Sequence, residues 1–312
     1  MPNIFVRAWK KHFTNYKILN KSLQSQLEEN RLQLEYLKEH VDITKLKPAT
    51  GLLRMQQLEL VKFATDFFNE IKEIQISPFL LCGNILGYVR HNGFIPWDDD
   101  LDFGLMRQDY EKLIKYCSSK FTVFTYTGKM TEYDFENEFK TKEYLCKTYP
   151  NQYVLTIWPG QLQLFKGTSL DDYKYLDFWA LDFFKDSYSF SEHVKYLHSV
   201  REKMLKINHV DKVVDFLKSE REGNINIVKD SNLIYFGIDC NMSYSKTNEN
   251  WIPKEVIFPL QEVIYENQKL LIPNLPEEYV KYEFKDYMKF PEKFGISAHN
   301  KALEDFKKRK LK

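Results

Sequence analysis

The sequence predicts a protein of the α+β class (mixed α/β), with a core sheet flanked by helices and a helical arm at the N-terminus. Short apolar runs bounded by turn residues alternate with amphipathic stretches of helical period, which is typical of strands mixed with helices. The chain has 312 residues, enough for one large domain or two small ones. We find no internal repeat and no low-complexity tract in it.

Composition argues against several functional classes. Lys and Arg total 45 and Asp and Glu total 44, so the net charge of +1 gives no nucleic-acid signal, and no nucleic-acid partner is expected. The cysteines are dispersed (Cys82, Cys117, Cys146 and Cys240), which disfavours a disulfide framework or a structural zinc site and suits a reducing compartment. The N-terminus lacks an apolar signal core, and no apolar run approaches the ~20 residues of a membrane span. We therefore expect a cytoplasmic protein.

The first predicted elements form an N-terminal arm, residues 1–47. Residues 1–22 are basic, with aromatic residues at helical spacing, as in helices that lie on anionic membranes. Residues 23–41 carry a short heptad pattern with Asn30 at one core position. Three interpretations stay open: peripheral contact with the inner face of a membrane, homo-oligomerisation through the arm, and packing on the chain's own domain or a partner.

One domain, residues 48–312, is expected after the break at "KPATG". Its helices are assigned from apolar residues at helical spacing, its strands from short apolar runs, and a hairpin from Glu266-Asn267 at a turn. In chain order we expect a helix at 52–71, a strand at 77–83, a helical turn from 84, a strand at 98–105, a helix at 108–120, strands at 121–128, 154–158 and 175–184, helices within 190–217, the hairpin at 262–274, a helix opened by Pro276 and a solvated basic tail at 307–312.

The segment "DDDLDFGL" carries the strongest chemical signal. Side chains on a strand alternate between faces, so Asp98, Asp100 and Asp102 share one face, opposite a mostly apolar one. A solvated acidic loop would not alternate in this way, and a calcium-binding EF-hand loop fails because Phe103 stands where that loop needs Gly. Carboxylate oxygens are hard ligands, so we predict a site for Mg²⁺ or Mn²⁺.

A phosphate-binding turn is predicted upstream of the aspartates. Gly83-Asn84 closes a strand and opens a helix, whose free N–H groups attract phosphate oxygens. Arg90 and His91 add positive charge between this turn and the aspartates. The order of a phosphate cradle and then an Asp-x-Asp metal motif is the layout of a nucleotidyltransferase-type site.

Three stretches together resemble the LicD/fukutin-related phosphotransferase family. The resemblance spans about Leu52 to His299 and rests on "LLCGNILGYVRHNGFIPWDDDLDFGLMRQDY" (Leu80–Tyr110), "YLDFWALDFF" (Tyr175–Phe184) and "IFPLQEVIYENQKLLIPNLPEEYVKYEFKDYM" (Ile257–Met288). It implies a nucleotidyltransferase-like fold that transfers a phosphorylated alcohol, phosphocholine or a polyol phosphate, from a CDP-linked donor to a hydroxyl of a glycan acceptor.

The resemblance also implies roles for individual residues. Asp100 and Asp102 match the family's metal-binding pair, Asp98 its flanking acid, and Asp177 the acid of the later segment. Asp177 would complete the metal site and accept the proton of the acceptor hydroxyl. The chain departs from the family's phosphate turn, where Cys82 and Asn84 replace a small Gly and a Thr, and at Ala180, where Pro is frequent.

Two other functions compete with this interpretation. A glycosyltransferase that uses a nucleotide sugar also employs Asp-x-Asp with Mn²⁺, but it does not explain the Gly83-Asn84 helix start or the Asp177 segment. A silent scaffold of a polymer-assembly complex would have no need for a row of mutually repelling carboxylates.

Overall fold

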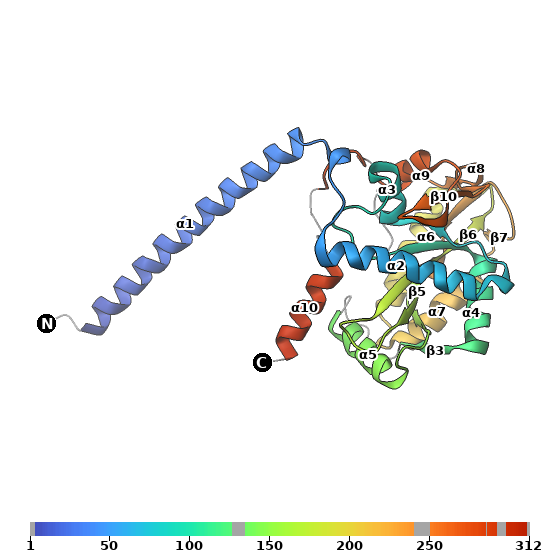
Figure 1. Ribbon diagram of the computed structural model, residues 1–312, viewed down its shortest axis with the longest axis horizontal. Coiled ribbons are helices and arrows are strands. Elements are labelled where there is room, and N and C mark those ends of the chain that lie inside the picture. Colours follow the sequence, from blue (N-terminus) through green and yellow to red (C-terminus); the bar gives the residue numbers. More distant parts are fainter. Residues whose placement is uncertain (1–3, 127–134, 240–249, 285, 292–297, 311–312) are drawn as a thin grey trace. The chain divides into compact units, whose positions relative to one another are not determined.

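The strands of the protein form one mixed sheet. The computed structural model describes residues 4–126, 135–239, 250–284, 286–291 and 298–310 (Figure 1). Its strands are β1 (Phe79–Leu80), β2 (Asp102–Met106), β3 (Thr122–Thr125), β4 (Val154–Trp158), β5 (Gln161–Lys166), β6 (Lys174–Phe184), β7 (Ile227–Val228), β8 (Leu233–Phe236), β9 (Ile252–Pro253), β10 (Gln261–Tyr265) and β11 (Gln268–Ile272). The order is β10-β11-β1-β2-β6-β5-β4-β3, with β7 and β8 also paired to β6, and β9 paired to β8.

The described residues also form helices, several of which pack on this sheet. The helices are α1 (Ile4–His40), α2 (Gly51–Glu70), α3 (Cys82–His91), α4 (Arg107–Lys120), α5 (Phe135–Thr148), α6 (Phe190–Met204), α7 (Val210–Glu222), α8 (Lys254–Ile257), α9 (Pro276–Glu283) and α10 (Ala298–Lys310). Helices α2 and α4 both pack against β6, and α3 packs against α9. The predicted mixed α/β class, with a core sheet flanked by helices, is confirmed.

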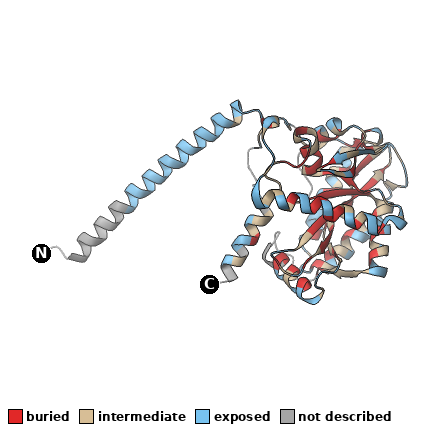
Figure 2. Ribbon diagram, in the orientation of Figure 1, coloured by how far each residue is buried: buried red, intermediate tan, exposed pale blue. Residues whose placement is uncertain are grey.

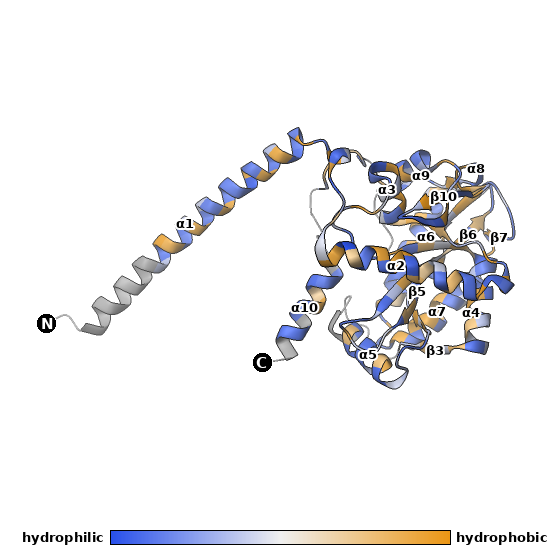
Figure 3. Cartoon of the chain, viewed as in Figure 1, coloured by the Kyte–Doolittle hydropathy of each residue, from blue (hydrophilic) through white to orange (hydrophobic). Residues whose placement is uncertain are grey.

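The chain divides into two compact units. One comprises Met1–Lys45 with Met288–Glu292, and the other Leu46–Tyr287 with Lys293–Lys312. In the first unit α1 is a continuous helix with hydrophilic and hydrophobic residues interspersed (Figure 3), and Lys38 Nζ donates to Pro291 O at 2.8 Å. The side chains of the basic aromatic segment before residue 16 lie outside the described part of the chain. The domain limits drawn from the sequence stay a prediction.

Strand β6 is the centre of the second unit. Its residues 175–182 are all buried, and Figure 2 shows the strands of the sheet as the most deeply buried part of this unit. Strand β2 lies directly beside it, in parallel. A Cβ at Gly104 of β2 would lie 2.2 Å from Leu81 Cδ1 and 2.9 Å from Phe79 Cζ, so only glycine allows this close packing of β1 and β2.

Most predicted elements are confirmed, but the strand at 98–105 is wrong in its start. Strand β2 begins only at Asp102, and β1 ends at Leu80 with α3 beginning at Cys82. Helix α5, strand β5 and helix α10 were not predicted. The basic tail was expected to be solvated, and Lys307, now part of α10, forms an ion pair with the exposed Asp171. The remaining predictions on residues 311–312, on Cys240 and on the end of the strand at 121–128 concern residues outside the described part of the chain. The hairpin is confirmed, with Glu266 and Asn267 in the left-handed region at φ 48° and 65°.

His193 of α6 is enclosed by aromatic rings. It is fully buried, and neither ring nitrogen has a hydrogen-bond partner among the described residues. The ring centres of Phe184 and Trp251 lie 4.6 and 4.8 Å from its own, and those of Tyr235 and Tyr188 at 5.6 and 5.7 Å. Burial lowers the pKa of His193 to about 3, because the imidazolium would be desolvated without a partner.

We expect His193 to make the protein less stable as the pH falls. Its folded pKa lies below the ordinary value of about 6.5, so below that pH only the unfolded chain takes up the proton. The free energy of unfolding should fall by about 1.4 kcal/mol per pH unit on this account. Urea unfolding between pH 7.0 and 4.5 measures how the free energy of unfolding changes with pH. His193→Phe should reduce this pH dependence by about that amount. The control His198→Gln, at an exposed position of α6, should leave it unchanged. An unchanged pH dependence in His193→Phe would contradict the prediction.

Candidate active site

Two predicted site carboxylates lie side by side at the centre of the sheet. In the parallel pairing of β2 with β6, Asp102 is the register partner of Asp177. Register partners on adjacent strands point to the same face, so the two carboxylates share one surface of the sheet. Both are buried, with 8% and 5% of their surface exposed. Asp102 also accepts a hydrogen bond of 2.8 Å from Trp179 Nε1.

The aspartates before β2 belong to a loop that side-chain amides hold in place. Residues 98–100 have no neighbouring strand, and their carbonyl oxygens are bound instead by side chains of α2 and α3. The donors are Gln57 to Asp98 O (2.9 Å), Gln56 to Asp99 O (3.1 Å) and Asn84 to Asp100 O (3.1 Å). These bonds replace the ladder of a strand, which is why the predicted strand starts late.

The start of α3, which the sequence suggests as a phosphate-binding turn, lies against this loop. A Cβ at Gly83 would lie 2.9 Å from Asp98 Oδ2, so a side chain there would displace that carboxylate. Asn84 is fully buried, and its Oδ1 accepts from Asp102 N at 2.6 Å. Its amide group therefore joins α3 to the first residue of β2.

Burial and mutual repulsion dominate the electrostatics of the cluster. Burial raises the pKa of Asp98 and Asp102 well above the usual range, and Asp100 adds to both shifts by repulsion. The pKa of Asp100 is also raised, by burial above all, although His299 opposes the shift. Burial raises the pKa of Asp177 to about 7. A group of this kind gains from a cation or another proton-rich partner.

Three polar side chains near Asp177 were not predicted. Gln161 and Gln163 of β5 donate to Asp177 Oδ1 at 2.9 and 2.8 Å. The buried ammonium of Lys142 on α5 pairs with Glu138, and its charge lowers the pKa of Asp177. The alternation of polar and apolar residues in Gln161-Leu162-Gln163-Leu164 is typical of a strand and could have predicted β5. Nothing in the local sequence marked Lys142.

His299 reaches the cluster from α10. Its Nδ1 lies 3.3 Å from Asp99 Oδ1 and 3.7 Å from Asp100 Oδ2, and Asn300 N donates to Asp99 Oδ2 at 2.8 Å. Burial lowers the pKa of His299, but the hydrogen bond to Asp99 and the charge of Asp100 outweigh it and raise that pKa to about 9.

Arg90 and His91 lie at the C-terminal end of α3. Arg90 donates to Tyr287 O at 2.8 Å and to His91 Nε2 at 2.9 Å, and its guanidinium lies 5.8 Å from the centre of the Trp97 ring. Burial lowers the pKa of Arg90 to about 10, although Asp98 opposes this shift, which places the two charges near each other. Burial, with Arg90 beside it, lowers the pKa of His91 to about 4.

Asp182 serves a different cluster. It lies five positions beyond Asp177 on β6, and an odd separation on a strand reverses the face. Its carboxylate binds Arg107 in a two-pronged ion pair, to Nε at 2.8 Å and Nη2 at 2.9 Å. Arg107 also pairs with Asp239 at 2.6 Å. Of the two acids in this strand, only Asp177 lies beside Asp102.

The donor chemistry of the cluster fits a hard divalent cation. Asp98, Asp100, Asp102 and Asp177 offer only oxygen ligands, as Mg²⁺ and Mn²⁺ prefer. Burial and mutual repulsion raise the pKa values of all four, and a cation among them would oppose that repulsion. Within the described residues, however, no three or more His, Cys, Asp or Glu side chains already converge on one point as a metal site would require. An ion would have to draw the carboxylates together.

The structure places acids on two parallel strands beside a helix start, the arrangement expected of a nucleotidyltransferase-type site. Residues 75–195 match the family model described as LicD/FKTN/FKRP, nucleotidyltransferase domain. The resemblance stated from the sequence is confirmed over this range, which is less than half of the chain and matches the LicD family model. The matched range contains all four carboxylates of the cluster, whereas His299 lies outside it.

Three curated relatives match shorter stretches. The lipopolysaccharide cholinephosphotransferase LicD of Haemophilus influenzae is 39% identical over 62 residues, 20% of this chain and 23% of the relative. Uncharacterised proteins of Rickettsia prowazekii and Rickettsia typhi are each 40% identical over 52 residues, 17% of this chain and 20% and 17% of their own lengths. The chain thus spans about a fifth of each relative. No helix in the described ranges is long and apolar enough to cross a membrane.

Proposed function

We propose that the protein transfers a phosphorylated alcohol from a CDP-linked donor to a hydroxyl group of a glycan acceptor. The observation that carries this proposal is the register pairing of Asp102 with Asp177, beside the start of α3. The match to the LicD family model over residues 75–195 supports the reaction type. The name of the Haemophilus relative supports phosphocholine as the group and lipopolysaccharide as the acceptor, with ribitol or glycerol phosphate as alternatives.

In this proposal the acids of the cluster have two roles, metal binding and proton acceptance. Asp98, Asp100 and Asp102 would hold Mg²⁺ or Mn²⁺, which when bound neutralises charge on the donor diphosphate. Asp177 accepts the proton of the attacking hydroxyl, held in place by Gln161 and Gln163.

The donor phosphates are proposed to bind at the start of α3. The backbone N–H groups around Gly83 and the helix dipole favour an anion there. Arg90 and His91 remain candidates for this role, although both side chains are engaged with each other and Arg90 also with Tyr287.

Donor binding is the experiment that tests the proposal. Isothermal titration with Mg²⁺ present should show binding of at least one of CDP-choline, CDP-ribitol and CDP-glycerol, at least tenfold tighter than UDP- and GDP-sugars. Chelation should weaken that binding by a similar factor, because the diphosphate loses its counter-charge beside four carboxylates, two of which are buried. Preference for a nucleotide sugar would favour the glycosyltransferase alternative. Absence of binding by every donor would favour a scaffold.

The arm is proposed to attach the protein to an anionic membrane surface, with self-association through residues 23–41 as the alternative. Each basic residue near such a surface contributes about 1 kcal/mol. Removing residues 1–45 should therefore weaken binding to phosphatidylserine vesicles at least tenfold and spare transfer to a water-soluble acceptor. Sedimentation of the protein with vesicles measures the first effect, and equal binding with and without the arm would contradict it.

A further inference from the structure

We propose that two adjoining cavities along α2 form one groove, which binds the glycan acceptor as a chain of several sugar units. This inference rests on the proposed function and deepens it, since it assigns the acceptor a place and a length. The groove lies within the second compact unit, between α2, the strands β4 to β6 and α10.

The inner cavity leads to the carboxylate cluster. It has a volume of about 310 Å³, and its lining includes Tyr175 and His299. The rings of these two residues are 5.8 Å apart, centre to centre, and His299 contacts both Asp99 and Asp100. A hydroxyl that enters this cavity can therefore approach the cluster past His299.

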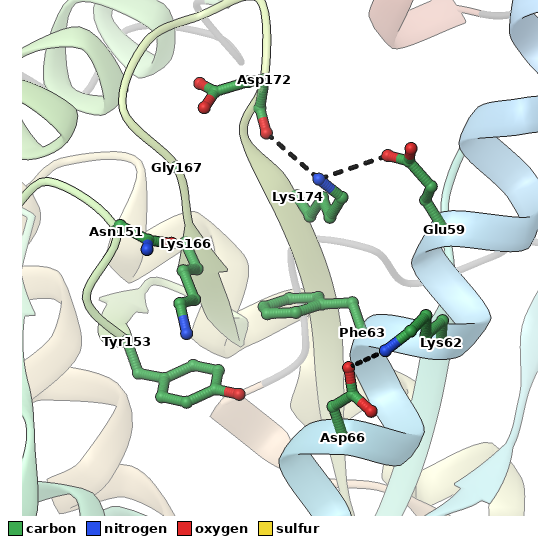
Figure 4. A pocket seen from close by; sticks show the side chains of 10 residues that line it. All are labelled: Glu59, Lys62, Phe63, Asp66, Asn151, Tyr153, Lys166, Gly167, Asp172 and Lys174. Carbon is green, nitrogen blue, oxygen red and sulfur yellow. Dashed lines mark hydrogen bonds and ion pairs between the residues drawn. The ribbon is translucent and has the colours of Figure 1, made fainter.

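The outer cavity continues away from the cluster. It has a volume of about 370 Å³ and is lined by α2, by the segment that leads into β4, by the end of β5 and by the segment that leads into β6. Figure 4 shows Phe63 and Tyr153 at its base and Lys166 directed toward the Tyr153 ring. The two rings are stacked with centres 5.9 Å apart, and Lys166 Nζ lies 4.2 Å from the centre of Tyr153.

The two cavities share part of their lining. Glu59, Asp172 and Lys174 border both of them. Lys174 Nζ pairs with Glu59 at 3.2 Å where the two cavities meet. The two side chains are 35% and 55% exposed, so this ion pair is open to solvent and does not separate the cavities as a buried contact would. Exposed ion pairs of this kind are weak, about 0 to 1 kcal/mol, so a ligand can displace it.

The chemistry of the groove suits a polyhydroxylated chain of low charge. Two of its three lysines are paired with acids, Lys62 with Asp66 at 2.5 Å and Lys174 with Glu59, so no strong field of one sign attracts a polyanion. Aromatic faces and alternating donors and acceptors are what sugar rings and their hydroxyl groups need. Lys166, which has no carboxylate partner among the described residues, offers one additional charged donor. The CDP-alcohol donor, with its charged diphosphate, fits the start of α3 better.

Acceptors of graded length test the groove. The probes are deacylated lipopolysaccharide oligosaccharides of one to six sugar units, with a saturating CDP-alcohol donor. For the full-length protein we expect KM to fall as the acceptor lengthens. Lys166→Ala and Lys174→Ala should each raise KM for the longest acceptor roughly tenfold, the loss of one hydrogen bond to a charged group. Their KM for a single sugar and their kcat should stay within about twofold of wild type. Lys112→Ala, at an exposed position on α4, is the matched control.

Equal effects on short and long acceptors, or no dependence of KM on length, would overturn the inference. Titration of the longest oligosaccharide by intrinsic fluorescence, with wild type and Lys166→Ala, gives a second test that needs no turnover. If the wild type binds the oligosaccharide and Lys166→Ala binds it more weakly, the groove is supported. A protein that binds the oligosaccharide in this way but uses none of the CDP-alcohols as a donor would contradict the proposed function and not the groove. Absence of binding in wild type overturns the groove.

Discussion

Replacing Asp100 by asparagine is expected to abolish transfer and leave the protein folded. Asparagine has nearly the same shape, so the hydrogen bond from Asn84 to the backbone oxygen of residue 100 is kept. What is lost is one partly buried negative charge in a group whose members repel one another. The rate should fall by at least 10³-fold, about 4 kcal/mol of transition-state stabilisation. The melting temperature without added metal should be unchanged or higher.

The control for this variant is Asp215→Asn, which removes a carboxylate from an exposed position of α7. Turnover and thermal melting should both match wild type in the control. Asp100→Asn with appreciable turnover, or wild type with full turnover in excess chelator, would contradict the assignment of these aspartates to a metal-binding role.

Asp177→Asn and Asp182→Asn are expected to fail in different ways. Asp177 lies beside Asp102, and a positioned general base contributes about 10²–10⁴-fold, so Asp177→Asn should lower kcat by at least that range. Donor affinity should change much less. Asp182 holds Arg107 in a buried ion pair, and removing one partner leaves the other charge uncompensated. Asp182→Asn should therefore lower the free energy of unfolding by roughly 3 kcal/mol and keep most of kcat at low temperature.

Kinetics and urea unfolding of both variants separate chemistry from stability. Asp239→Asn is the matched control for Asp182, because it removes the other, more exposed acid bound to Arg107 and should destabilise the protein less. The reverse pattern, with Asp182→Asn inactive but stable and Asp177→Asn active, would show that the wrong aspartate of β6 has been assigned to the reaction.

The sequence predicted those features that depend on local pattern. The period of β6 indicated opposite faces for Asp177 and Asp182, and the structure places them so. The turn at Glu266-Asn267 and the helix opened by Pro276 are likewise local and were predicted. The family resemblance located the cluster, and the register of β2 with β6 brings its two halves together.

Features that depend on distant parts of the chain could not be predicted. Alternation suggested a strand through Asp98 and Asp100, but Gln56 and Gln57 of α2 bind the loop carbonyls that a strand would have used. Lys142 and His299 come to the cluster from helices that no local signal connects to it. Such contacts are set by how α2, α5 and α10 pack, which periodicity does not encode.

Product analysis tests the central claim most directly. The protein is incubated with Mg²⁺, a lipopolysaccharide-derived oligosaccharide and each of CDP-choline, CDP-ribitol and CDP-glycerol in turn, and the products are quantified by mass spectrometry and phosphorus NMR. With at least one donor, the proposed function predicts one CMP released for each phosphorylated alcohol joined to the acceptor in a phosphodiester bond, and neither product with Asp100→Asn. Transfer of a sugar from a nucleotide sugar, with every CDP-alcohol left intact, would contradict it.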